Sequence, residues 1–297
     1  MDDQRKAYAA ALGAVACWST VAAAFKLTLA HIGSDALVVY SAAAALVFLG
    51  TVTLVTGSLR EFRRWTTVDV VRSATLGALN PFLYYLVLFK AYDLLPAHQA
   101  QPLNFAWPVV LVALSAILLR QRIRALSYAA LAISFSGVVI IATGGNPLSF
   151  TLSDPLGVAL ALGSTVVWAL YWLYSASDRR DPVNRLAANF AFGLAYVVLY
   201  AAVSGRLEWP SAAAAAGSVY IGLMEMGLGF VFWLRALKLS RTTAEVGNLI
   251  YLTPFLSLLV ITVVVGERIG PPTWIGLVLI VAGIVAQNRF GQAPLRA

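Results

Sequence analysis

The feature that most constrains this chain is a series of long apolar stretches separated by short polar breaks. A helix needs roughly 17 to 25 apolar residues to cross the hydrocarbon core of a bilayer. Stretches of this kind recur along the sequence at residues 8–30, 35–56, 73–92, 99–119, 125–143, 155–176, 186–203, 212–234, 244–265 and 272–288. The sequence therefore predicts an all-α integral membrane protein with ten transmembrane helices.

Composition excludes the main alternatives to a membrane protein. Hydrophobic residues make up 60% of the 297 residues and charged residues 11%, whereas a soluble domain carries about 25% charged residues. So few charges cannot cover the surface of a soluble globular protein, and such high hydrophobicity excludes intrinsic disorder. The first apolar stretch also exceeds the signal-peptide core of roughly 7 to 15 residues, so it is expected to stay as the first transmembrane helix.

The basic residues follow the expected membrane topology. A net charge of +8 raises the question of a nucleic-acid partner. If the N-terminus is cytoplasmic, however, all of the 21 lysines and arginines except Lys26, Lys90, Arg206 and Arg268 fall on the cytoplasmic side. This asymmetry is the positive-inside rule, which places both termini in the cytoplasm. The charge is thus explained without nucleic acid, and none is expected as a partner.

The sequence also contains an internal repeat, in which residues recur about 145 to 150 positions later. The clearest pairs are Trp18 with Trp168, Gly77 with Gly222, and Pro108 with Pro254. Because each copy has five spans, an odd number, the second copy must cross the membrane in the opposite direction. We expect a first five-helix repeat in residues 1–146 and a second, inverted one in residues 147–297. This architecture is typical of secondary transporters; a duplicated membrane enzyme or scaffold is the alternative.

Polar and aromatic residues near the span centres are the candidates for a substrate site at the bilayer midplane. The candidate substrate-binding residues are Trp18, Asn80, Tyr84, Gln101, Asn104, Trp107, Trp168, Tyr171, Glu225, Asn248 and Tyr251. Their aromatic faces suit an aromatic ring and attract an ammonium group through cation–π contact. The amides and Glu225 are expected to bind the ammonium and carboxylate groups of the substrate between them. Helix packing is the alternative role for the two central tryptophans.

Asn80 and Glu225 occupy equivalent positions of the two repeats. A charged carboxylate within the membrane costs roughly 2.5 kcal/mol or more, so Glu225 is expected to be protonated or paired. In the functional interpretation it contacts a substrate ammonium or carries a coupling proton. In the structural one it donates a hydrogen bond to a facing helix. The sequence is compatible with both.

Pro108 and Pro254 stand in the middle of the fourth span of each repeat. A proline there removes a backbone hydrogen bond and kinks the helix. The freed carbonyls favour a gating role, whereas a static bend is the alternative.

Motifs for catalysis, nucleotide binding and metal binding are missing. There is no Gly-x-x-x-x-Gly-Lys phosphate loop, and His31 and His98 lack the spacing of metal ligands. The single cysteine, Cys17, excludes an intramolecular disulfide. No catalytic residue, metal site or cofactor is therefore predicted, and the protein is not expected to be an enzyme.

The two five-span halves resemble the EamA branch of the drug/metabolite transporter superfamily. The resemblance rests on Pro108 and Pro254 and on Glu267-Arg268-Ile269, and the first half departs from it with Arg120-Gln121-Arg122. Three shorter motifs are similar to aromatic amino-acid exporters of that superfamily: Cys17-Trp18-Ser19-Thr20, Asn104-Phe105-Ala106-Trp107-Pro108 and Tyr251-Leu252-Thr253-Pro254.

This resemblance implies a secondary transporter of a bacterial-type inner membrane that exports aromatic and other neutral amino acids by alternating access. Its partners would be the amino-acid substrate and the lipid bilayer. One alternative is export of another small metabolite or of a lipophilic cationic drug, since the aromatic residues and Glu225 would suit such a cation. A membrane-embedded lipid enzyme is a further alternative, although the chain lacks a catalytic constellation for it.

Overall fold

The computed structural model describes residues 3–118, 125–146, 152, 154–241 and 246–290, and every regular element among them is a helix. The first half contains α1 (Asp3–Leu29), α2 (Ser34–Val55), η1 (Ser58–Arg64), α3 (Thr67–Gly77), η2 (Ala78–Leu83), α4 (Tyr84–Leu94), α5 (Ala97–Asn104), α6 (Trp107–Leu118) and α7 (Ala125–Ala142). The second half contains α8 (Pro155–Ser175), α9 (Pro182–Val203), α10 (Ala212–Ile221), η3 (Gly222–Leu228), α11 (Gly229–Leu239), η4 (Asn248–Leu252), α13 (Thr253–Val260), η5 (Ile261–Val265) and α14 (Pro271–Phe290). The predicted all-α class is confirmed for these residues.

Among the described residues, 8 helical segments are long and apolar enough to cross a membrane. They are Asp3–Leu29, Ser34–Val55, Ala97–Leu118, Pro155–Ser175, Pro182–Val203, Ala212–Leu239, Asn248–Val265 and Pro271–Arg289, and Tyr128–Ala142 is a shorter apolar helix. These segments overlap all the predicted spans except 73–92. That stretch lies in α3, η2 and α4, where Asn80 and several tyrosines lower the hydropathy. A multispanning helical protein is thus supported, and the count of ten remains a prediction.

Two helices of the second half start at an aspartate followed by proline. Asp154 accepts a hydrogen bond from the backbone N–H of Gly157 at the start of α8, at 2.7 Å. Asp181 accepts from two backbone N–H groups at the start of α9. Such side chains satisfy N–H groups that have no partner within the helix, and proline suits the first helical turn. Helix α8 begins at residue 155 as predicted, whereas α9 begins four residues before the predicted span 186–203.

Two long helical rods are interrupted at equivalent positions of the repeat. The π-helical segment η2 joins α3 to α4, and η3 joins α10 to α11. In η2, Asn80 has an extended backbone (φ −142°, ψ 118°) next to Pro81, which lacks an N–H. Interruptions of this kind free backbone groups and redirect side chains, and they are frequent at functional sites.

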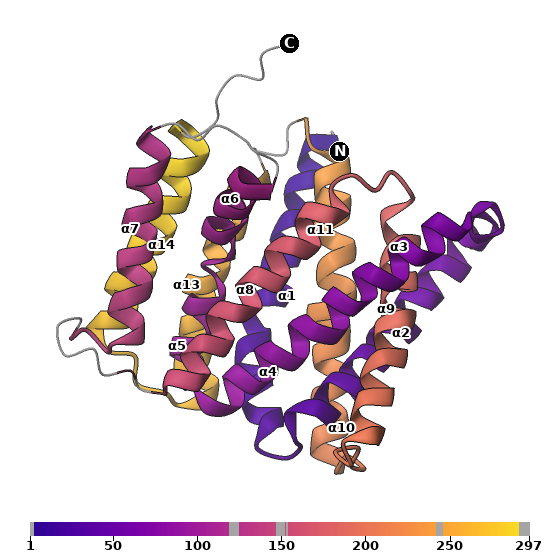
Figure 1. Ribbon diagram of the computed structural model, residues 1–297, viewed down its shortest axis with the longest axis horizontal. Coiled ribbons are helices and arrows are strands. Elements are labelled where there is room, and N and C mark those ends of the chain that lie inside the picture. The colour runs from indigo at the N-terminus through magenta and orange to yellow at the C-terminus, as the bar shows by residue number, and fades with distance from the viewer. Residues whose placement is uncertain (1–2, 119–124, 147–151, 153, 242–245, 291–297) are drawn as a thin grey trace.

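The helices form a central group flanked by two outer groups (Figure 1). At one edge α7 packs along α14, where Gly137 lies against the backbone of Gly276. At the opposite edge lie α2, α3 and α9, and α1, α8, α11 and α13 lie between the two edges. The first turn of α1 and the last turn of α14 are at the same end of the molecule (Figure 1). This end is called the terminal end below, and the other end the opposite end.

Candidate functional site

The central helices enclose a cavity of about 320 Å³. Its lining comes from α1, α4, α5, α6, α8, η3, α11, η4, α13 and α14, so it draws on both halves of the chain. The lining includes Asn288, two residues before the end of α14, so the cavity extends towards the terminal end. Most of the other lining residues are aromatic, and Glu225 is the one charged side chain among the lining residues that the structure describes.

A stack of aromatic rings forms one wall of the cavity. The rings of Tyr84 and Trp168 lie parallel, with centroids 4.4 Å apart and an interplanar angle of 26°. Tyr171 also stacks with Trp168, with centroids 5.6 Å apart, and Phe230 makes an edge-to-face contact with Trp168 at 5.8 Å. Offset and edge-to-face contacts of this kind stabilise rings in fixed orientations. The wall therefore presents a rigid, flat apolar surface.

Trp18 lies on another wall, next to the interrupted helix. Its indole Nε1 donates a hydrogen bond to the main-chain oxygen of Glu225 at 3.2 Å. The ring also contacts Phe230 and Trp233, each with a centroid distance of 5.9 Å. Gly229 makes this approach possible, because a Cβ there would lie 2.6 Å from the Trp18 Nε1 atom. The π-helical turn, the glycine and the tryptophan thus fit together as one unit.

The side chain of Glu225 projects into the cavity from η3. The hydroxyl of Tyr85, a fully buried residue, donates to its Oε1 at 3.2 Å. The Tyr85 hydroxyl is the hydrogen-bond partner of this carboxyl group, which otherwise faces the largely aromatic lining of the cavity. The carboxyl group can therefore bind a cationic group that enters the cavity, or exchange a proton with it.

Amide and hydroxyl groups line a third part of the cavity. Tyr84 donates to Oδ1 of Asn104 at 3.3 Å, and Asn104 donates through Nδ2 to Ser164 at 2.9 Å. Tyr92 donates to Oε1 of Gln101 at 2.8 Å, which leaves the Gln101 Nε2 group as a donor. These contacts fix the orientation of both amides.

Most of the predicted site residues come together at this cavity. Its lining includes Trp18, Tyr84, Gln101, Asn104, Trp107, Trp168, Glu225, Tyr251 and Pro108. Tyr171 does not line the cavity, but its ring stacks with that of Trp168.

Three predicted residues lie elsewhere. Asn80 is fully buried outside the lining, because the extended backbone in η2 changes the direction of its side chain. Asn248 is exposed at the start of the 3-10 helix η4, whose tighter turn differs from the α-helix assumed for that span. Pro254 also lies outside the lining. Pro108 is the second residue of α6, after a turn at residues 105–106, and Pro254 is the second residue of α13, which follows the 3-10 helix η4 directly.

Sequence reasoning missed several lining residues, among them Phe25, Tyr92, Trp172 and Trp233. Helical spacing is the signal that points to some of them. Tyr92 lies two turns after Tyr84, and Trp233 lies two turns after Glu225.

At the opposite end of the molecule, the two halves are joined by Glu267. Its carboxylate accepts from the backbone N–H groups of Ala97 and His98, both at 2.9 Å, and lies 2.6 Å from His98 Nδ1. Burial opposes ionisation of this carboxyl, but the hydrogen bonds from His98 and the two N–H groups outweigh it and lower the pKa of Glu267. Glu267 thereby caps α5 from the other repeat.

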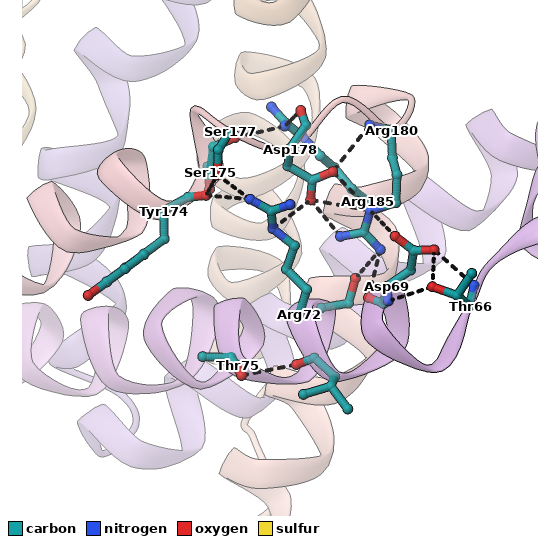
Figure 2. Close-up of polar contacts among 12 residues, drawn as sticks. Thr66, Asp69, Arg72, Thr75, Tyr174, Ser175, Ser177, Asp178, Arg180 and Arg185 are labelled. Carbon is teal, nitrogen blue, oxygen red and sulfur yellow. Dashed lines mark hydrogen bonds and ion pairs between the residues drawn. The ribbon is translucent and has the colours of Figure 1, made fainter.

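A second polar cluster joins three helices outside the cavity (Figure 2). Arg72, Arg180 and Arg185 converge on Asp178, which lies between α8 and α9. Arg180 pairs with Asp178 at 2.5 Å and also donates to the main-chain oxygen of Asp69 in α3. Burial opposes ionisation, but hydrogen bonds and charge from Arg180 lower the pKa of Asp178. The cluster fixes α3, α8 and α9 relative to one another. Two of these helices connect to the aromatic wall, since α8 contains Trp168 and α3 continues through η2 to Tyr84.

No group of three or more His, Cys, Asp or Glu side chains within the described part of the chain is arranged to hold a metal ion.

Several known proteins with similar sequences are described as transporters. The EamA-like transporter family matches residues 5–143 and 155–288. A protein of Streptantibioticus cattleyicolor, described as a probable terminal-alkyne amino-acid exporter, is 29% identical over 231 residues, which is 76% of each chain. The aromatic amino acid exporter YddG of Ancylobacter novellus is 27% identical over 186 residues, 61% of this chain and 63% of that protein.

Two further similarities agree with these. The uncharacterized transporter YvbV of Bacillus subtilis is 25% identical over 74% of this chain and 72% of its own length. One crystal structure shares the fold with a TM-score of 0.69 at 23% identity, covering 97% of this chain and 99% of that one.

Proposed function

Because the chain belongs to the EamA-like transporter family, we propose that it is a secondary transporter that exports aromatic and other neutral amino acids from the cytoplasm. The observation that carries this proposal is a cavity walled by stacked aromatic rings and containing a single charged side chain, Glu225, among its described lining residues. Two of the similar proteins are described as amino-acid exporters.

The substrate is proposed to bind with its side chain against the aromatic walls. An aromatic ring entering between Trp18 and the Tyr84–Trp168 stack would meet ring faces and edges on both sides. An aliphatic side chain would gain the same apolar burial without the stacking.

The two charged groups of the amino acid would use different partners. The ammonium group suits Glu225, with cation–π contacts from the neighbouring rings. The carboxylate suits amide donors, and Gln101 Nε2 is available as one. A zwitterion bound in this way brings its own compensating charges into the membrane, which lowers the cost of burying Glu225.

Alternating access is proposed to arise from two inverted five-helix repeats, residues 1–146 and 147–297, in ten transmembrane helices. The interruptions at η2 and η3, the turn before Pro108 and the change from 3-10 to α-helix before Pro254 are suited to act as hinges. Both termini are proposed to lie in the cytoplasm, so that the terminal end of the cavity faces inward in an inner (plasma) membrane.

The decisive experiment is efflux from proteoliposomes preloaded with labelled phenylalanine, tryptophan, threonine and methionine, with and without an imposed pH gradient. Protein-dependent release of these amino acids is expected, and the gradient comparison identifies proton coupling. Lack of release from vesicles that contain folded protein would contradict the proposal. Transport of a lipophilic cation in the same vesicles would then favour a drug or another metabolite as the substrate.

A further inference from the structure

An apolar groove lies on the surface of the molecule between α9 and η2. Its lining residues are Ala78 and Phe82 from η2, and Tyr196, Leu199, Tyr200, Val203 and Ser204 from one face of α9. The groove has a volume of about 540 Å³. It is separate from the central cavity, with which it shares no lining residue.

Aromatic rings line the groove, which is open to the outer surface of the helices. Phe82 meets the edges of Tyr196 and Tyr200, with centroids 6.0 and 6.1 Å apart. Leu199 is 64% exposed and Val203 is 81% exposed. Because this face belongs to a membrane-spanning helix, its apolar surface contacts lipid chains.

The groove leads directly into a polar hollow. Ser204 lines the groove, and the next two residues, Gly205 and Arg206, line a hollow of about 380 Å³. Gly205 has a left-handed backbone (φ +65°), which turns the chain at the end of α9. Because Ser204, Gly205 and Arg206 follow one another in the chain, the groove and the hollow adjoin at the end of α9.

The polar hollow is lined by two cations, Lys90 and Arg206, and by three carboxylates, Asp35, Asp93 and Glu208. Lys90 pairs with Asp93 at 2.6 Å. Arg206 pairs with Asp35 at 3.0 Å, yet its side chain is 64% exposed and keeps further N–H donors free for a ligand. Glu208 is exposed, and its carboxylate also accepts from the backbone N–H of Gly33. Nearby Trp209 is 93% exposed, which is typical of a tryptophan at the membrane–water interface. The hollow thus lies at the depth of lipid headgroups.

We propose that the groove and the hollow together bind one phospholipid with a primary-amine headgroup. An acyl chain lies in the groove against Phe82 and Tyr200, the phosphate lies at Arg206, and the ammonium lies at Glu208 and Asp35. Asp35 and Asp93 are paired with Arg206 and Lys90, whereas Glu208 has no ion pair among the described residues. The charges therefore favour this class over a lipid with only a negative headgroup, which would leave Glu208 without a cationic partner. The site goes beyond the proposed transport function and does not depend on it.

The groove and the central cavity are lined by neighbouring residues of one helical rod. Ala78 and Phe82 belong to η2, and Tyr84, the first residue of α4, follows directly and forms part of the aromatic wall. A bound acyl chain therefore packs against η2, the interruption between α3 and α4.

The test uses the full-length protein in lipid nanodiscs that contain a trace of phospholipid with a photoreactive acyl chain. Three headgroups are compared: ethanolamine, choline and glycerol. Labelled peptides are mapped by mass spectrometry. We expect labelling of residues 196–204 and 78–82, and about threefold more of it with ethanolamine than with glycerol, as for one partly exposed ion pair.

Four variants make the test specific, and thermal unfolding checks that each is folded. Leu199→Trp, which fills part of the groove, should remove the labelling, whereas Val198→Trp on another face of α9 should not. Glu208→Gln retains an acceptor for Gly33 and should remove the ethanolamine preference, and Arg206→Gln should lower labelling by all three lipids.

Three outcomes would overturn the proposal. They are equal labelling by the three lipids in the unmodified protein, labelling that Leu199→Trp leaves unchanged, and cross-links that show a second copy of the chain on this face.

Discussion

Replacing Asp178 with asparagine should destabilise the protein more than any single change at an exposed ion pair. The Asp178 side chain is 1% exposed, and its partners Arg180 and Arg72 are 12% and 34% exposed. Removing one member of a buried pair costs about 3 to 5 kcal/mol, because the remaining charge stays buried. Since water screens Arg72 in part, we expect a loss of about 3 kcal/mol in the free energy of unfolding.

The pH dependence of this effect has a definite sign. The pKa of Asp178 is lower in the folded protein than its usual value, through Arg180. The carboxylate therefore stabilises the fold fully above the unfolded pKa of about 3.9, and this contribution disappears as the pH falls through the lower folded pKa. The difference between the unmodified protein and Asp178→Asn should be largest near neutral pH and shrink below about pH 4.

Unfolding of the purified protein in mixed micelles, driven by denaturing detergent, measures this free energy. Asp3→Asn is the matched control, because Asp3 belongs to an exposed pair with Lys6 and should change stability by less than about 0.5 kcal/mol. A double-mutant cycle with Arg180→Gln should give a coupling of about 2 kcal/mol. Equal stability of Asp178→Asn and Asp3→Asn would refute the reasoning.

Four further predictions concern the cavity and the packing. Trp168→Ala removes the centre of the aromatic stack and should lower phenylalanine efflux about 3- to 10-fold relative to threonine efflux; an unchanged ratio would reject ring stacking. Glu225→Gln should remove the response of transport to a pH gradient and should also slow downhill efflux, because the substrate ammonium loses its charged partner; an unchanged response would reject Glu225 as the proton carrier. Glu267→Gln weakens the cap on α5 and should cost about 1 kcal/mol at neutral pH; because the folded pKa is lowered, the loss should vanish as the pH falls below about 4, and a pH-independent loss in the unfolding assay would contradict this. Gly77→Ala places a Cβ against the backbone of α9 and should destabilise by about 1 to 3 kcal/mol, whereas Gly163→Ala, which meets open space, should be neutral in the same assay.

The cavity shows how far helical spacing can predict a site. Trp18, Trp168 and Glu225 were expected at the centre of their spans, and all three line the cavity. Asn80 and Asn248 were assigned to it on the assumption of continuous α-helices. The rods are instead interrupted, by an extended residue in η2 and by a 3-10 turn in η4, so side chains near the breaks change direction.

Local sequence patterns were sufficient for whatever depends on neighbouring residues. Apolar length predicted membrane helices, and the predicted start of the span at residue 155 coincides with the start of α8. These features depend on hydrophobic transfer and on backbone hydrogen bonds within a few positions, which a linear sequence displays directly.

Tertiary structure alone decided which distant side chains meet. The contact of Trp18 with the main chain of Glu225, the cap of α5 by Glu267 and the junction of Arg72 with Asp178 each join residues more than a hundred positions apart. Such contacts depend on how the helices cross and rotate about their axes. Many packings of apolar helices satisfy the same hydrophobic pattern, and close packing at small residues, together with the few buried polar groups that require partners, selects one of them.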